Sequence, residues 1–276
     1  MIKISEIKLP LDSDEKELRT AAAKALRCKE ERITSLRIAK KAVDSRKKDN
    51  VFFVYNVYAE VDSDEAAIIA HSRNSKVEAY TEYKYVMPPV RRKSTLRPVI
   101  AGFGPAGFFA ALTLARAGLR PIVLERGADV DTRTQKVNVF WTQRKLDTES
   151  NVQFGEGGAG TFSDGKLTTG IKDPLCRKVV DELIAHGAPE EIGYSSRPHI
   201  GTDRLGAVVK AFREEIPNTT KIIIAQRVSS IEDADQIIVL DDGKIAGVGT
   251  SEELLKTNDI YREVYESQVK GGGDDE

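Results

Sequence analysis

Residues 1–90 alternate apolar and polar positions in a pattern that predicts a small β-α-β-β module. The stretch IKISEIKLPL has a period of two, as expected of a half-buried strand. A helical period follows it, with Asp12 or Ser13 as the expected N-cap. The apolar face of this helix consists of Leu18, Ala22 and Leu26. Two further alternating stretches, ITSLRIAKKAV and NVFFVYNVYAEV, flank the polar turn DSRKKDN and predict two more strands.

A second pattern, that of a β-α-β unit, begins after the connector EYKYVMPPVRRKSTLRP, which is rich in proline and basic residues. Residues 99–101 and 122–124 predict two apolar strands, and the residues between them have helical spacing. The turn after the first strand is GFGPAG. In such a turn Gly102 permits the tight bend, Gly104 lets a pyrophosphate approach the backbone, and Gly107 lets helix and sheet pack closely.

The residues around this turn favour a dinucleotide-binding site over a structural turn. The expected helix would direct the unpaired N–H groups of its first turn at an anion. Glu125 ends the second strand, about twenty residues beyond the glycines, where a carboxylate can accept hydrogen bonds from a ribose diol. A carboxylate there also disfavours a 2′-phosphate. The pattern therefore predicts a dinucleotide that lacks this phosphate.

In detail, GFGPAG, LARAG and VLERG resemble the FAD-binding variety of this motif. Residues 1–213 resemble a family of FAD-dependent dehydrogenase-like proteins of undefined substrate, to which WTQRKLDTESN, QFGEGG and RPHIGTDRL also correspond. The resemblance implies a partial Rossmann-like FAD-binding domain over residues 91–213 and oxidoreductase activity on an unidentified small molecule. It implies these cofactor-binding residues: Gly102, Gly104, Pro105, Ala106, Gly107, Glu125 and Arg126. We identify no catalytic residue.

A second glycine-rich stretch, GEGGAGTFSDGKLTTG, comes close to the spacing of a nucleotide-binding P-loop. Gly160 is followed after four residues by Gly165 and Lys166, but Leu167 stands where Ser or Thr would hold magnesium. The preceding residues are polar rather than a buried strand. We interpret the stretch as a second flavin-contacting loop, with ATP and Mg²⁺ as the alternative ligand. The expected cofactor-contacting residues are Gly157, Gly158, Gly160, Ser163, Asp164 and Lys166.

Residues 214–270 have the pattern of a separate α/β fragment. Strands are expected at residues 221–225, 236–240 and 244–248, with Asp242-Gly243 as the turn of a hairpin. A capping-box spacing at Thr250 then precedes one expected helix, SEELLKTNDIYREVYESQ. The stretch TKIIIAQRVSSIEDADQIIVLDDGKIAGVGT and this helix resemble the end of the ATP-binding domain of an ABC exporter.

The resemblance implies a fragment without ATPase activity. Gln226 stands at the switch position where that family usually has a histidine, and Gln carries no charge near pH 7. The sequence has no P-loop, signature motif or strand ending in Asp-Glu ahead of this stretch, so ATP could not be positioned. The flavoprotein family, for its part, continues into a further cofactor-contacting segment that we do not find here. We therefore expect a chimera with weak FAD binding and little turnover; the alternative is a two-domain protein whose tail serves structure only.

Composition removes several other functions. The 276 residues include 42 basic and 43 acidic ones, so charge indicates neither nucleic acid nor an anionic membrane as a partner. The spacing of the three histidines and two cysteines indicates neither a metal site nor a disulfide framework. No apolar run suits a membrane span or a signal peptide, so we expect a cytoplasmic protein. The polar residues 271–276 are expected to be disordered. A transporter partner would follow only from the ABC alternative, and a non-catalytic α/β protein remains a third possibility.

Overall fold

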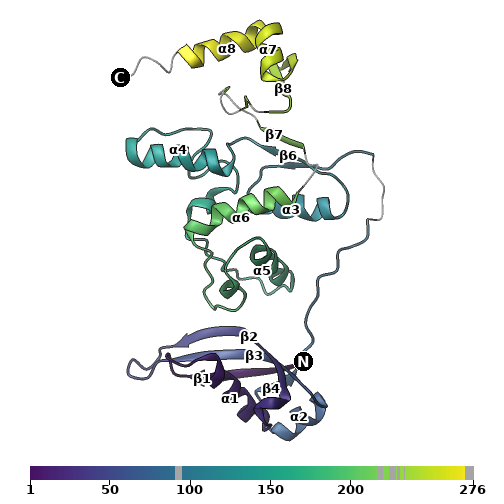
Figure 1. The fold of residues 1–276 in the computed structure, drawn as a ribbon, viewed down its shortest axis with the longest axis vertical. Helices are drawn as coiled ribbons and strands as arrows, with labels where there is room; N and C mark the ends of the chain where they lie inside the picture. The colour runs from purple at the N-terminus through teal and green to yellow at the C-terminus, as the bar shows by residue number, and fades with distance from the viewer. Residues whose placement is uncertain (91–94, 217–219, 224–227, 229–230, 233, 271–276) are drawn as a thin grey trace. The chain divides into compact units, whose positions relative to one another are not determined.

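The computed structural model describes two compact units of mixed α/β structure (Figure 1). The first consists of residues 1–88 and 163–208, and the second of residues 89–162 and 209–276. The structure describes residues 1–90, 95–216, 220–223, 228, 231–232 and 234–270. Three features of the sequence interpretation lie outside the described residues: the last two residues of the strand expected at 221–225, Gln226, and the C-terminal residues 271–276.

The first unit contains an antiparallel four-stranded sheet in the order β2-β3-β1-β4. The predicted β-α-β-β elements are confirmed, and a further helix and a short edge strand follow them. The strands are β1 (Ile2–Leu9), β2 (Ile33–Asp44), β3 (Phe52–Val61) and β4 (Val77–Ala79). The helices are α1 (Glu15–Leu26), α2 (Glu65–Ser72) and α5 (Leu175–Ala185), with short 3-10 turns at Glu30–Arg32 and Glu190–Gly193.

Helix α1 begins later than its sequence pattern indicated. Asp14 is the N-cap, so the expectation of Asp12 or Ser13 was wrong. The reason is the capping box: the Asp14 carboxylate accepts the N–H of Glu17, and the Glu17 carboxylate accepts the N–H of Asp14. The predicted apolar face is confirmed, because Leu18, Ala22 and Leu26 are buried in one cluster with the inward-facing residues of β1 and β3.

The second unit contains a parallel sheet in the order β5-β6-β7. Its first two strands, β5 (Val99–Ala101) and β6 (Ile122–Glu125), and the helix between them, α3 (Pro105–Arg116), confirm the predicted β-α-β unit. Strand β7 (Thr220–Ile223) belongs to the stretch that resembles an ABC ATPase, yet it pairs with β6 in parallel register. Between β6 and residue 162 this unit also contains α4 (Val130–Gln143) and a 3-10 turn at Ala159–Phe162. Helix α6 (Thr202–Glu215) leads the chain from the first unit's residues into those of the second.

The C-terminal elements of the second unit form a small cluster of their own. Strands β8 (Ile237–Asp241) and β9 (Lys244–Gly249) pair in an antiparallel hairpin, whose turn residues Asp242 and Gly243 have φ angles of 45° and 74°. The predicted hairpin and the Thr250 capping box are therefore confirmed. The expectation of one closing helix was wrong, because Asn258 separates α7 (Ser251–Thr257) from α8 (Asp259–Lys270). The Asn258 side chain bonds Ala246 O and the N–H of Tyr261, which fixes the break.

Candidate functional site

The glycine turn between β5 and α3 is the centre of the candidate site. Gly102 has a φ of 92°, a left-handed conformation that favours glycine, and its N–H donates to Leu124 O at 2.6 Å. A Cβ at Gly107 would overlap the carbonyl oxygen of Gly102. By contrast, a Cβ at Gly104 would meet only the Cα of Gly158 at 3.8 Å, an ordinary contact. The protein itself thus requires glycine at 102 and 107 but not at 104.

The first turn of α3 can receive an anion. Gly104 is the N-cap, and among the described residues no side chain caps this end of the helix. Pro105 occupies the first position, where its missing N–H costs no hydrogen bond. The N–H groups of Ala106 and Gly107 lie in the turn where a helix provides no acceptor of its own. Together with the helix dipole, these groups form a site of the type that binds phosphate.

Glu125 lies beside this turn at the end of β6. Its Oε2 accepts the N–H of Phe103 at 2.7 Å, and its Oε1 accepts the N–H of Gly127 at 2.8 Å. Each carboxylate oxygen has a second lone pair, which a ribose hydroxyl could use. Arg126, the next residue, pairs with Glu149 at 3.1 Å and lies over the ring of Phe154. Its half-exposed side chain is held by these surface contacts.

The second glycine-rich stretch meets the first one backbone to backbone. The N–H of Gly157 donates to Phe103 O at 2.8 Å, and a Cβ at Gly158 would lie 3.3 Å from the Cα of Gly104. The N–H of Gly158 donates to Gly155 O. These amides therefore serve the contact between the two stretches in this structure, and their binding to an anion stays a prediction. A Cβ at Gly160 would have no neighbour within 4 Å, so this glycine faces open space.

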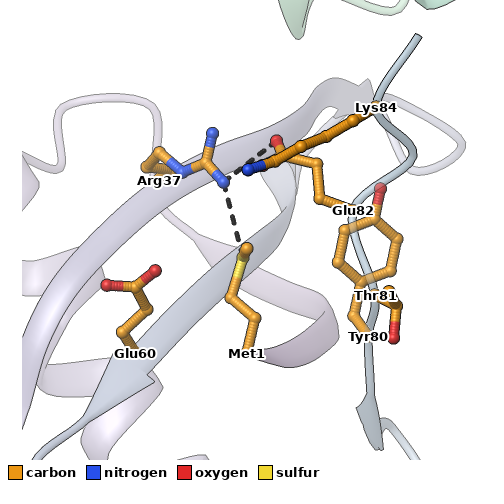
Figure 2. Close-up of a pocket in the computed structure, with 7 residues that line it drawn as sticks. All are labelled: Met1, Arg37, Glu60, Tyr80, Thr81, Glu82 and Lys84. Carbon is orange, nitrogen blue, oxygen red and sulfur yellow. Dashed lines mark hydrogen bonds and ion pairs between the residues drawn. The ribbon is translucent and has the colours of Figure 1, made fainter. Parts of the chain in front are cut away.

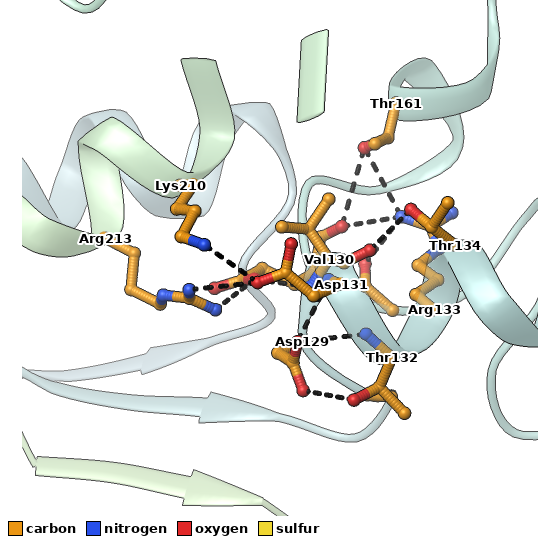
Figure 3. Close-up of polar contacts among 12 residues, drawn as sticks. Asp129, Val130, Asp131, Thr132, Arg133, Thr134, Thr161, Lys210 and Arg213 are labelled. Carbon is orange, nitrogen blue, oxygen red and sulfur yellow. Dashed lines mark hydrogen bonds and ion pairs between the residues drawn. The ribbon is translucent and has the colours of Figure 1, made fainter. Parts of the chain in front are cut away.

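A network of charged side chains, buried at Glu156 and exposed at Asp131 and Lys210, includes a residue of the second stretch (Figure 3). Glu156 is 5% exposed; its Oε2 accepts the N–H of Val130 at 2.7 Å and lies 3.0 Å from Nη1 of Arg213. Asp131 receives two cations at the protein surface, Lys210 at 3.1 Å and Arg213 at 3.8 Å. Sequence reasoning missed this network. The available signal was an acidic residue enclosed by glycines in GEGG, where a solvated loop would not need one.

Asp129 begins helix α4 and has a perturbed acidity. Burial raises the pKa of Asp129. Hydrogen bonds from the Thr132 hydroxyl and from the backbone N–H groups of Thr132 and Asp131 lower it by more, so the net shift is downward. A carboxyl with a lowered folded-state pKa stabilises the fold above its ordinary pKa, and this contribution disappears as the pH falls through the folded-state pKa.

Replacing Asp129 by alanine should therefore lower the free energy of unfolding by about 1 kcal/mol at pH 7, because the cap is lost. The difference should shrink as the pH falls through the lowered folded-state pKa of Asp129, because the wild-type carboxyl then becomes protonated. Urea unfolding over a series of pH values from 7 downward measures both effects. Asp129→Asn retains an oxygen acceptor and should cost less at pH 7. Equal losses for the two variants would contradict the capping role.

Ser163, Asp164 and Lys166 belong to the first unit, whereas the glycines discussed above belong to the second. The Asp164 carboxylate lies 3.2 Å from Nζ of Lys166 and 3.7 Å from Nδ1 of His199. The N–H of Leu167 donates to Pro198 O and that of Ile200 to Gly165 O, so residues 164–167 and 198–201 run side by side. Sequence reasoning did not anticipate this pairing. All of these charged side chains are well exposed, and their proximity to a flavin stays a prediction.

A pocket of about 550 Å³ lies on the sheet of the first unit (Figure 2). Its lining residues are Met1, Arg37, Glu60, Tyr80, Thr81, Glu82 and Lys84. Arg37 pairs with Glu82 at 3.1 Å, and the ring of Tyr80 stacks on that of Tyr58 at 4.1 Å. Burial and the neighbouring Tyr80 hydroxyl raise the pKa of Tyr58. The lining thus contains both cations and anions, of which Arg37 and Glu82 form an ion pair.

One comparison concerns the first 60 residues of the chain, and another concerns most of its length. Residues 1–60 match a family model described as "Domain of unknown function (DUF8436)". An uncharacterized protein of Clostridium beijerinckii is 50% identical over 217 residues, which are 78% of this chain and 40% of that relative. The chain thus spans less than half the length of this relative.

Other matches are to parts of ABC transporters and involve the C-terminal region. The ABC transporter ATM1 of Toxoplasma gondii is 50% identical over 62 residues, which are 22% of this chain and 6% of the transporter. The C-terminal region is similar to ATP-binding proteins of ABC transporters. An ATP-dependent lipid A-core flippase of Mannheimia succiniciproducens is 38% identical over 95 residues, 34% of this chain and 16% of the flippase. Each match covers only a small part of a transporter.

Two further features can be stated for the described part of the chain. None of its helices is long and apolar enough to cross a membrane. Within the same residues, His, Cys, Asp and Glu do not gather in groups of three or more that could hold a metal ion.

Proposed function

We propose that the second unit binds the ADP half of FAD and that the chain belongs to an FAD-dependent oxidoreductase. The observation that supports this most is the turn at Gly102–Gly107, where an uncapped helix N-terminus, a sterically unneeded Gly104 and the Glu125 carboxylate lie together. A pyrophosphate would accept hydrogen bonds from the first turn of α3, and a ribose would donate to Glu125. Bound FAD would supply the redox chemistry through its isoalloxazine ring.

The second glycine-rich stretch would complete this site. Gly158 approaches Gly104 and Pro105 because it has no side chain, and Gly160 leaves open space beside it. Together these glycines would let a flat, extended cofactor pass close to the backbone. Ser163, Asp164 and Lys166 remain proposed contacts on the flavin side.

We expect the affinity for FAD to be modest. Among the described strands β5 pairs only with β6, and Val99 on it is 61% exposed. Parallel sheets are normally covered on both faces, so such an edge makes the site less rigid than in a complete sheet.

Replacing Gly104 by alanine tests the proposal. The fold tolerates a methyl group there, so the free energy of unfolding should change by less than about 1 kcal/mol. The same methyl group would occupy the approach of the pyrophosphate, and the dissociation constant for FAD should rise by at least about tenfold. Flavin fluorescence quenching on the full chain measures the affinity, and urea unfolding measures stability. Equal FAD affinity in the wild type and the variant would contradict the proposed site.

A second candidate function is that of an ABC transporter ATP-binding protein, which the similarity of the C-terminal region favours. Under it a transporter subunit would be the partner and Mg²⁺-ATP the ligand. Leu167 directly follows Lys166, and its side chain offers no oxygen to Mg²⁺. We therefore expect Mg²⁺-ATP to leave the melting temperature unchanged. A rise that depends on both Mg²⁺ and ATP would favour this second function over FAD binding.

A further inference from the structure

Arg133, on helix α4, is a fully buried cation that bonds four carbonyl groups of one loop. Its Nε donates to Asn151 O at 2.8 Å and its Nη2 to Val152 O at 3.0 Å. Its Nη1 donates to Glu156 O at 2.6 Å and to Gly155 O at 3.3 Å. The guanidinium has five N–H donors, and here they bond backbone carbonyl groups rather than a single carboxylate. A single side chain thereby holds both ends of this loop.

The environment makes these bonds difficult to replace. Burial lowers the pKa of Arg133 to about 10, while the nearby charges of Glu125 and Glu156 act against this shift, so the group stays charged near pH 7. The guanidinium lies 4.9 Å from the ring centre of Phe162, and Nη1 also reaches the hydroxyl of Thr161. A buried charge is tolerated only when its donors are satisfied. The loop carbonyls therefore have to remain turned toward Arg133.

The loop transmits this constraint to the glycine turn. A Cβ at Gly155 would lie 2.7 Å from Cδ of Arg133, so the loop backbone packs directly on the side chain. Two residues later the N–H of Gly157 donates to Phe103 O, inside the turn that begins α3. Gly158 then approaches Gly104. A shift of the loop Asn151–Gly158 would therefore move Gly157 and Gly158 relative to the turn at Gly102–Gly107.

We propose that Arg133 is a positioning residue for the dinucleotide site: it sets the loop Asn151–Gly158 so that Gly157 and Gly158 shape the space above Gly104. The inference rests on the proposed function, because the space matters only if a dinucleotide occupies it. Arg133 itself is buried and acts through the loop. An arginine is required rather than a lysine, because a single ammonium cannot reach carbonyl groups spread over both ends of the loop.

The test compares Arg133→Lys with Lys136→Met in the full chain. Lys136 lies on the same helix and pairs with Asp147 at 3.1 Å, with both side chains less than a fifth exposed. Its loss should destabilise the fold while leaving the Asn151–Gly158 loop in place. At a temperature where both variants remain folded, Arg133→Lys should bind FAD about tenfold more weakly than the wild type, and the visible circular dichroism of the bound flavin should change. Lys136→Met should retain the wild-type values for both measurements.

The outcomes separate the inference from the function on which it rests. Wild-type binding together with equal affinity in the two variants overturns the positioning role alone. Failure of the wild type to bind FAD overturns both the proposed function and this role. If Arg133→Lys does not fold, hydrogen exchange on the wild type decides. Slow exchange of the loop amides before FAD is added supports positioning by the protein, whereas protection that arises only with FAD overturns it.

Discussion

Replacement of Gly107 by alanine is expected to lower the free energy of unfolding of the second unit by about 3 kcal/mol. The added Cβ would overlap the carbonyl oxygen of Gly102, and a Gly102 carbon lies 2.9 Å from its position. These are backbone atoms at the end of β5, so no side chain can move aside. Relief would require α3 to separate from β5 and β6. Urea unfolding of the full chain, followed by circular dichroism, measures the loss.

Gly170→Ala is the matched control for this experiment. A Cβ at Gly170 would have no neighbour within 4 Å, and its φ lies outside the left-handed region. We expect a change of less than about 0.5 kcal/mol for this variant. Equal stability of Gly107→Ala and Gly170→Ala would show that the described turn is not the one the protein adopts. Loss in Gly107→Ala alone supports the close packing of helix and sheet.

Replacement of Glu156 by alanine is expected to be at least as costly, with a loss of about 3–5 kcal/mol. Its side chain is 6% exposed and bonds the N–H of Val130 and the guanidinium of Arg213, which is 19% exposed. The variant leaves a buried N–H without its acceptor and a largely buried cation without its closest carboxylate. Thermal and urea unfolding of the variant measure the loss.

Lys210→Ala serves as the control for Glu156→Ala, because Lys210 contributes to the same network from the surface. Its ion pair with Asp131 joins side chains that are 45% and 61% exposed. Such a pair contributes less than about 1 kcal/mol and should weaken further in salt. A loss for Glu156→Ala as small as that for Lys210→Ala would indicate that Glu156 is solvated rather than buried.

The sequence predicted those elements whose pattern is local. Period-two alternation identified β1, β2 and β3, and the glycines with Glu125 identified the β-α-β unit. These signals are local because each records one face of one element or one bend of the backbone. The N-cap of a helix also depends on nearby residues, yet the sequence pattern indicated Asp12 or Ser13 instead of Asp14 for α1. Several short polar residues can accept from the first turn, and the reciprocal bond of Glu17 decides among them.

Features that depend on tertiary contacts could not be predicted in this way. Arg133 lies on a helix among polar residues, where sequence alone indicates a solvated position, and only the folded loop shows that it is buried. The pairing of β7 with β6 joins residues about a hundred positions apart, which no local period records. The break at Asn258 likewise depends on its bond to Ala246 in the preceding hairpin.

Strand β7 links the region that resembles an ABC ATPase to the sheet of the β-α-β unit. The C-terminal region is similar to ABC transporter ATP-binding proteins, and the stretch TKIIIA contributes to that resemblance. Its strand nevertheless provides the third strand of the parallel sheet that carries the glycine turn. Strand β7 therefore contributes to this sheet by backbone pairing with β6.

Binding of FAD by the purified 276-residue chain is the most direct test of the central claim. Protein expressed with flavin present should be yellow, should release FAD on denaturation, and should bind added FAD in equilibrium dialysis with an affinity that falls in Gly104→Ala. A colourless protein that takes up no FAD in dialysis, although its circular dichroism shows the mixed α/β fold, would contradict the account.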